Sequence, residues 1–183
     1  MPSATPEDCD ALYRDDPDPW NFRDSPYEHA KYRATLDFLP RARYGHILEV
    51  GCAIGVLGRL LAGRCDRYLG IDASARALDE ARRGAPPNMD FRLICVPEAF
   101  PDGPFDLVVL SEILYFLCAR DVRLLASRIA RSADVILVNW TGSTDRDLQG
   151  PEAAELFAAA FGRQPDRVTE VRHFRVDIFR ATS

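Results

Sequence analysis

Two glycines and an aspartate are spaced in this chain as a nucleoside-binding turn requires. The segment from Ile47 to Gly55 reads I-L-E-V-G-C-A-I-G, an apolar run that meets one glycine at Gly51 and a second at Gly55. Asp72 follows at the end of another apolar run, residues 68–71. This pattern predicts a strand, a glycine turn, a helix and a second strand with an acid at its tip. An acid in that place accepts hydrogen bonds from both hydroxyls of an adenosine ribose.

The glycine spacing separates two classes of cofactor. A dinucleotide-binding turn needs G-x-G-x-x-G, because its second glycine lets backbone amides approach a pyrophosphate. Ala53 occupies that position here, and Glu49 stands two residues before the first glycine. A carboxylate near the turn would repel a pyrophosphate, but it would not repel a sulfonium that also carries an ammonium group. The sequence therefore favours S-adenosylmethionine (SAM), with S-adenosylhomocysteine (SAH) as the product, over NAD.

The expected cofactor site is built from the ends of four strands. It comprises Glu49, Gly51, Cys52, Ala53, Gly55, Asp72, Ala73, Val96, Pro97, Leu110 and Ser111. Asp72 could instead only cap the helix that follows it, but Ser74 already meets that need. After the third strand the chain offers Cys95 and Val96 rather than an acid, so backbone groups would bind the adenine edge, with Glu98 within reach.

Polar side chains follow the fourth predicted strand, residues 105–110, where an apolar core would not place them. They are Ser111, Glu112 and Tyr115, and they would lie beside the methyl group of the cofactor. Glu112 and Tyr115 are the candidate catalytic residues. Glu112 could accept a proton from an attacking amine, directly or through water, or attract the ammonium form. The alternative for Glu112 is an acid at a helix start, without a part in the site.

An alternating α/β fold is needed to bring these residues together. Strands are predicted at 46–50, 67–71, 91–95, 105–110 and 134–139, and helices at 54–62, 74–84, 120–131 and 151–162. Two runs of alternating apolar and polar residues, 167–174 and 176–180, predict two more strands, at least one of them antiparallel. The expected fold is α/β, a Rossmann-like doubly wound, mostly parallel seven-stranded sheet with an antiparallel C-terminal strand.

The chain is expected to form a single domain, residues 1–183, with a flexible start at 1–15, an N-terminal lid and helix at 16–44 and a Rossmann-like core at 45–183. The first part is polar and rich in proline and aspartate, as flexible segments are. Ser25, Pro26 and Glu28 have the types and spacing of the first residues of a helix, which must end near Pro40.

Composition and charge narrow the function classes. The net charge is −5, and no basic face of the kind that binds nucleic acid is visible. The five cysteines show no C-x-x-C spacing, and no apolar signal segment precedes them, so we expect reduced thiols in a cytoplasmic protein. The three histidines lack metal-ligand spacing, and no apolar run is long enough for a bilayer. We therefore expect no metal and no membrane or nucleic-acid partner, and a monomer or homodimer that acts on a small-molecule acceptor.

The cofactor motifs resemble the class I SAM-dependent methyltransferases over most of residues 45–140. A second resemblance, to the nodulation protein S family, rests on Asp18-Pro19-Trp20, Tyr27-Glu28-His29-Ala30-Lys31-Tyr32, Thr35-Leu36, Leu39-Pro40 and the segment 111–117. Members of that family N-methylate the free amine of a de-N-acetylated chitooligosaccharide. The resemblance implies an N-terminal segment that folds over the cofactor. It makes Trp20 a cofactor-site residue and makes Tyr27, Lys31 and Tyr32 candidates for the lid or pocket, with helix-to-core packing as the alternative.

The implied function is transfer of a methyl group from SAM to a small-molecule acceptor, above all the amine of an amino sugar. An O- or N-methyltransferase of another metabolite or natural product is the alternative. Two departures from the usual pattern stand out: residues 131–134 replace a Pro-Gly-Gly turn, and the connection at 139–144 is too short to suggest a long oligosaccharide cleft. Asn139 and Trp140 could face the acceptor, where an aromatic ring suits a sugar face, or Trp140 could be buried under the last helix. An NAD-dependent oxidoreductase would need a Tyr-x-x-x-Lys or similar hydride-handling set beyond the glycine turn, and none follows it. A non-catalytic SAM-binding module is disfavoured by the polar residues after the fourth strand.

Overall fold

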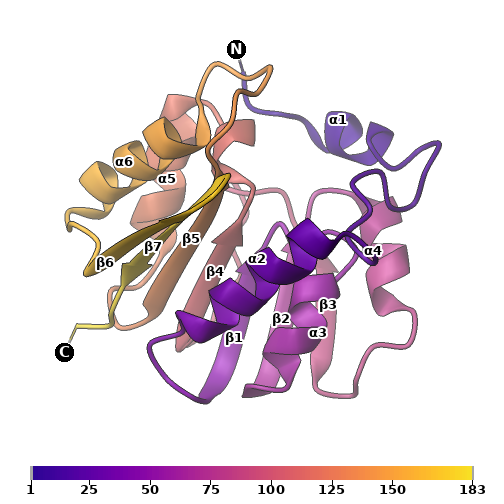
Figure 1. The fold of residues 1–183 in the computed structure, drawn as a ribbon, viewed down its shortest axis with the longest axis horizontal. Helices are drawn as coiled ribbons and strands as arrows, with labels where there is room; N and C mark the ends of the chain where they lie inside the picture. Colours follow the sequence, from indigo (N-terminus) through magenta and orange to yellow (C-terminus); the bar gives the residue numbers. More distant parts are fainter. Residues whose placement is uncertain (1, 183) are drawn as a thin grey trace.

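A computed structural model of the chain describes residues 2–182, which form one sheet covered by helices on both faces (Figure 1). The strands are β1 (Tyr44–Val50), β2 (Cys65–Asp72), β3 (Met89–Leu93), β4 (Leu107–Ser111), β5 (Asp134–Trp140), β6 (Arg167–Val171) and β7 (Phe174–Phe179). The helices are α1 (Pro6–Ala11), α2 (Pro26–Asp37), α3 (Val56–Ala62), α4 (Ala75–Arg82), the 3-10 turn η1 (Leu114–Phe116), α5 (Ala119–Arg128) and α6 (Gly150–Phe161).

The seven strands lie in the order β3-β2-β1-β4-β5-β7-β6. Strands β1 to β5 are parallel, and β7 runs antiparallel to both of its neighbours, β5 and β6. The expected doubly wound, mostly parallel sheet with an antiparallel strand near the C-terminus is confirmed. The strand order reverses between β1 and β4, and ligands of such sheets bind at that point, outside the carboxyl ends of the strands.

The central strands β1, β2, β4 and β5 are largely buried because helices cover both faces, so their sequences contain nearly continuous apolar runs. Alternate residues of these strands enter two different cores. Leu48 and Leu110 pack with Phe157 in the core under α5 and α6, whereas Ile47 and Leu57 belong to the core under α2, α3 and α4. This packing fixes where each strand ends and therefore where the site can form.

The N-terminal segment, residues 1–15, is the start expected to be flexible, and Met1 lies outside its described part. It contains the short helix α1, which begins at a capping box: the Asp8 N–H donates to Thr5 Oγ1 over 3.1 Å, and the Thr5 N–H donates to Asp8 Oδ2 over 3.0 Å. The Ala4 N–H also donates to the Phe116 carbonyl over 2.9 Å. The segment thereby lies across the end of the sheet where the parallel strands finish (Figure 1).

Helix α2 begins as the sequence predicts. Ser25 is its N-cap, and the Ser25 hydroxyl accepts a hydrogen bond from the Glu28 N–H over 3.3 Å. Pro26 occupies the first turn, where its missing N–H costs nothing. This cap fixes the start of α2, whose first two turns lie near the carboxyl ends of the parallel strands.

Candidate active site

The turn after β1 has a backbone that requires glycine. Gly51 and Gly55 have φ angles of 75° and 76°, and Ala53 between them has a φ of 47°. A Cβ at Gly51 would overlap the side chain of Ile113, so a larger residue there would displace the segment after β4. The N–H groups of Gly51 and Cys52 both donate to the Ile71 carbonyl, over 2.9 and 3.1 Å, which binds the turn to the end of β2. Glycine at these two positions thus allows the positive φ angles of the turn, as expected.

Asp72, at the end of β2, is fixed by backbone donors from two elements. Its Oδ2 accepts from the Ala53 N–H, and its Oδ1 accepts from the Ser74 N–H, each over 2.9 Å. Burial raises the pKa of Asp72 above its ordinary value, although these backbone donors act in the opposite direction. A carboxylate offers about four acceptor positions, so two remain for hydroxyls of a ligand.

A cavity of about 550 Å³ covers the carboxyl ends of the parallel strands. This volume lies within the roughly 300–1,000 Å³ that small-molecule sites occupy. Nine of the residues predicted for the site line it: Trp20, Gly51, Ala53, Asp72, Ala73, Val96, Ser111, Glu112 and Tyr115. Five others are absent from its lining: Glu49, Cys52, Gly55, Pro97 and Leu110.

The lining follows from the alternation of side chains along the strands. Leu110 is fully buried in the core under α5 and α6, and Cys52 is buried in the core on the other face. Pro97 is buried. Gly55 is the N-cap of α3 and lies beyond the loop's contact with the cavity. The side chains of these residues lie outside the cavity lining.

Glu49 points away from the cavity, which removes the carboxylate that we expected beside the turn. It is 2% exposed, and its Oε2 accepts a hydrogen bond from the Tyr68 hydroxyl over 2.5 Å. Burial raises the pKa of Glu49 to about 8. Glu49 is therefore placed to support the sheet under α3, and the case for SAM over NAD rests on the glycine spacing instead.

Replacing Glu49 by glutamine is expected to change how stability depends on pH. Because the pKa of Glu49 is raised from 4.5 to about 8, the folded chain holds a proton that the unfolded chain has lost between these values. Stability from this group is full below the unfolded pKa and falls as the pH rises through the folded pKa. Denaturant unfolding from about pH 5 to about pH 9 should show wild type losing stability relative to Glu49→Gln. A difference independent of pH would contradict this placement.

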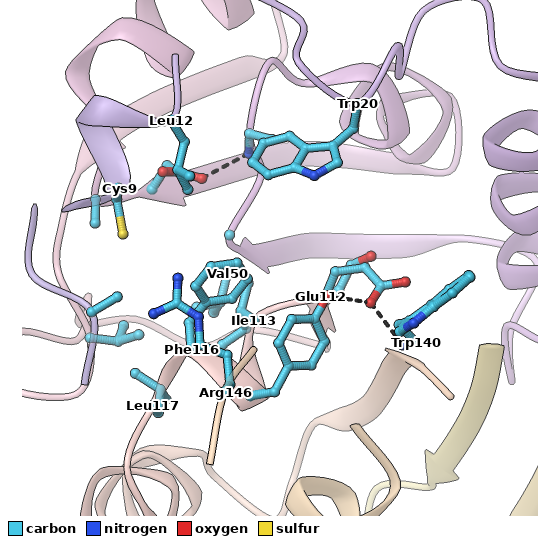
Figure 2. Close-up of a pocket in the computed structure, with 18 of the residues that line it drawn as sticks. Cys9, Leu12, Trp20, Val50, Glu112, Ile113, Phe116, Leu117, Trp140 and Arg146 are labelled. Carbon is cyan, nitrogen blue, oxygen red and sulfur yellow. Dashed lines mark hydrogen bonds between the residues drawn. The ribbon is translucent and has the colours of Figure 1, made fainter. Parts of the chain in front are cut away.

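At the far end of the cavity, Glu112 is held by donors from three elements. Its Oε1 accepts from Lys31 Nζ of α2 over 2.9 Å. Its Oε2 accepts from the Tyr115 hydroxyl and from the Trp140 N–H, each over 2.8 Å (Figure 2). The φ of Glu112 is 60°, an unfavourable conformation for a residue other than glycine, and such strain persists only where surrounding contacts hold it. These contacts fix the direction of the carboxylate.

Glu28, Lys31 and Glu112 form what we call the acidic cluster. Lys31 Nζ lies 2.9 Å from an oxygen of each carboxylate, and its side chain is only 4% exposed. One ammonium between two carboxylates leaves a formal charge of −1 in a partly buried place, where charges are screened less than at the surface. The three residues line one end of the cavity, which is therefore suited to a cationic or donor-rich group.

The Tyr115 hydroxyl donates its hydrogen bond to Glu112. Burial, together with the charge of Glu112, raises the pKa of Tyr115 far above its ordinary value. The phenol therefore stays protonated and donates to the carboxylate, so it cannot serve as a base near neutral pH. Tyr115 is thus placed to fix the direction of the Glu112 carboxylate.

Some of the candidate residues from the N-terminal block and β5 line the cavity, and others are buried outside it. Trp20 and Trp140 line the cavity, with Trp20 44% exposed on the side opposite Glu112 (Figure 2). Tyr27 lines it as well, whereas Tyr32 is buried in the core. Asn139 is fully buried and lies outside the lining.

Several residues of the lining were missed from the sequence. The N-terminal segment contributes Cys9, Leu12, Tyr13 and Phe22, and the later loops contribute Ile113, Phe116, Leu117 and Arg146. Arg146 lies over the Phe116 ring, 4.7 Å from its centroid. The capping box at Thr5 was a local signal for α1, but nothing local showed that α1 would cover the cavity.

Asp10 fastens α1 to the start of α4. Its Oδ1 accepts from Ser74 Oγ and from the Arg76 N–H, each over 3.0 Å, and its Oδ2 accepts from Arg76 Nε over 2.9 Å. Because α1 carries Cys9 over the cavity, Asp10→Ala is expected to raise the Kd for SAH about fivefold, as measured by titration calorimetry. Glu7→Ala, an exposed acid of the same helix, is the matched control. Equal affinity in the two variants would show that α1 does not retain the cofactor.

The site fits SAM from one end to the other. At the carboxyl ends of the parallel strands, Val96 follows β3, Asp72 ends β2, the glycine turn follows β1, Glu112 follows β4 and Trp140 ends β5. Neighbouring strands lie about 4.8 Å apart, so the ends of β2 and β4 are separated by about 10 Å. That spacing suits a nucleoside at Asp72 with its charged sulfur reaching toward the acidic cluster.

The strand order, the glycine turn and the acid after β2 define a class, that of the Rossmann-like SAM-dependent methyltransferases. Comparison with known proteins gives the family. The family model described as "Nodulation protein S (NodS)" matches residues 5–137, and the chain belongs to this family.

Individual relatives agree with this assignment. Nodulation protein S of Rhizobium tropici is 33% identical over 103 residues, which are 55% of this chain and 43% of that protein. The chain thus spans less than half the length of this relative. A putative methyltransferase from Pseudomonas syringae has a TM-score of 0.70 at 29% identity and covers 84% of this chain and 97% of its own. N-methyltransferase NodS of Bradyrhizobium japonicum WM9, solved with SAH, has a TM-score of 0.76 at 20% identity, covering 94% and 95%.

Between residues 2 and 182, no helix combines the length and the apolar character that a membrane span needs. Over the same range, no group of three or more histidine, cysteine, aspartate or glutamate side chains is arranged to hold a metal ion.

Proposed function

We propose that this chain is a SAM-dependent N-methyltransferase that methylates the amine of a small-molecule acceptor. The observation that carries the proposal is the acidic cluster, which places a net negative charge at the end of the cavity away from Asp72. An amine is the acceptor that gains most from this charge, because its nitrogen becomes positive as the new bond forms. The N-methyltransferase activity named for the B. japonicum relative supports the same choice.

The cofactor end of the site binds and orients. Asp72 accepts hydrogen bonds from the ribose hydroxyls, while the turn of Gly51 and Ala53 lets the backbone approach the ligand. Trp20 and the residues of α1 cover this end and exclude water. When bound, SAM supplies an electrophilic methyl group on a sulfonium.

The acceptor end directs and stabilises the amine. Glu112 accepts hydrogen bonds from Lys31, Tyr115 and Trp140, which fix its carboxylate in place and leave an acceptor position for a ligand. It attracts the amine and stabilises the charge that develops on its nitrogen, a contribution that preorganised charges make in water-poor sites. The surplus proton of the methylated amine then passes to solvent. The remaining contribution to the rate comes from holding the amine nitrogen in line with the methyl carbon and the departing sulfur.

The finer proposal is that the acceptor is an amino sugar. Trp140 lines the cavity beside Glu112, where its ring offers a flat apolar surface of the kind that packs on sugar faces (Figure 2). The loop after β5 is short, which favours one or a few sugar units over a long chain. An O- or N-methyltransferase of another small metabolite is the second candidate, because Ser111 and Arg146 also line the cavity.

Methyl transfer from labelled SAM tests this directly. Purified protein is incubated with a de-N-acetylated chitooligosaccharide and, as the matched control, with its fully N-acetylated counterpart. Label on the free-amine sugar alone is the expected result. No label on either sugar, with SAH binding confirmed in the same preparation, would overturn the amino-sugar acceptor. The same assay with non-sugar amines and alcohols then tests the second candidate, and no transfer to any amine would overturn the proposal as a whole.

A further inference from the structure

The ring of Tyr27 is held in place on three sides. Tyr27 lies in the first turn of α2, and its ring meets Trp140 edge-on, with centroids 5.9 Å apart, and Phe174 with centroids 6.3 Å apart. The Lys31 ammonium lies 5.5 Å from the centre of the Tyr27 ring. The direction of the hydroxyl is therefore set by packing and not by a hydrogen bond of its own.

The hydroxyl of Tyr27 is buried without a hydrogen-bond partner among the described residues. Buried polar groups are nearly always paired, so each exception calls for an explanation. Tyr27 also lines the cavity, at the end where the acidic cluster lies. An unpaired hydroxyl in this place has its partner in whatever enters the cavity.

The charges around Tyr27 define what that partner can be. Burial and the carboxylates of Glu112 and Glu28 raise the pKa of Tyr27, which keeps the phenol protonated. Its oxygen still accepts hydrogen bonds, and Glu112, which already receives donors from protein, attracts positive charge. A ligand group between them is therefore one that donates to both.

Building on the proposed function, we propose that the Tyr27 hydroxyl binds the reacting nitrogen and selects a primary amine. One N–H of the acceptor donates to Tyr27 while a second is directed to Glu112. An alcohol has a single O–H, and a secondary amine has one N–H in its neutral form, so neither neutral group satisfies both. Tyr27 is then an acceptor-binding residue that favours the first methylation over the second.

Tyr27→Phe tests the inference, with Tyr44→Phe as its matched control. Tyr44 is also buried, but its hydroxyl accepts from the Arg41 N–H over 3.1 Å at the opposite end of β1. With glucosamine as the probe, Tyr27→Phe should raise the acceptor KM about tenfold without lowering Tm, because it removes an unpaired hydroxyl. Tyr44→Phe should lower Tm and leave the glucosamine KM unchanged.

The same assay with N-methylglucosamine separates selection from simple affinity. Wild type should prefer glucosamine, and Tyr27→Phe should lose most of that preference. Suppose that wild type is active on glucosamine while Tyr27→Phe keeps the same KM and the same preference for glucosamine over N-methylglucosamine. That result would overturn the inference about Tyr27 but not the proposed function. A wild type that binds SAH but methylates no amine would overturn the proposed function, and the inference would fall with it.

Discussion

Replacing Asp72 by alanine is expected to lower the affinity for SAH at least ~100-fold, because two hydrogen bonds to a carboxylate are lost together. Asp72 is the acid that lines the cavity at the end of β2, and backbone donors from Ala53 and Ser74 already fix its orientation. The affinity should be measured by titration calorimetry at neutral pH. Burial raises the pKa of Asp72, so its carboxylate is protonated earlier when the pH is lowered. As the pH is lowered, the affinity of wild type for SAH should therefore begin to fall at a higher pH than it would with an ordinary aspartate.

Asp79→Ala is the matched control for Asp72→Ala. Asp79 lies on α4, is 71% exposed and pairs with Arg82 at the surface, so its loss should leave SAH binding and Tm almost unchanged. Thermal unfolding of both variants shows whether the fold is kept. If Asp72→Ala stayed folded and bound SAH within a few-fold of wild type, the ribose would have to bind elsewhere.

Replacing Glu112 by glutamine should reduce kcat/KM for an amine acceptor roughly 100-fold, the loss found when a fixed charge-stabilising group is removed. Glutamine keeps the shape of the side chain but removes its charge, and the acidic cluster becomes neutral. Lys31 keeps Glu28 as a partner at 2.9 Å, so the change should affect catalysis far more than stability. Because Asp72 is untouched, the affinity for SAH should stay close to that of wild type.

Glu98→Gln provides the control for this change. Glu98 is a 65% exposed carboxylate that lies outside the cavity lining, so its loss should not affect transfer. If Glu112→Gln had a normal kcat and a normal acceptor KM, the charge of Glu112 would have no part in the mechanism. An equal loss of SAH affinity would instead mean that Glu112 belongs to the cofactor end of the site.

The central fold was predictable because its signals are local. Strands β1, β2, β4 and β5 are apolar runs bounded by turns, and glycines with positive φ angles stand in the turn after β1, at Gly51 and Gly55, and after α6, at Gly162. The alternating runs at the C-terminus correctly indicated two strands with antiparallel pairing. Helix α1 was missed because it has only six residues in a polar, acidic context, although its capping box was visible in the sequence.

The site was predictable only as far as it follows from strand order. Asp72 and the turn after β1 must meet in any sheet of this topology, whereas the pairing of Glu112 with Lys31 joins residues 81 positions apart. The inward direction of Glu49 was missed for a similar reason. The sequence shows that a residue ends a strand, but which face it occupies depends on the packing of α3 against that strand.

A crystal structure of the chain with SAH tests the central claim most directly. The account predicts the ribose hydroxyls within hydrogen-bonding distance of Asp72, and the sulfur facing the end of the cavity formed by Glu112, Tyr27 and Trp140. SAH bound with Asp72 free of contact, or with its sulfur directed away from Glu112, would contradict the account.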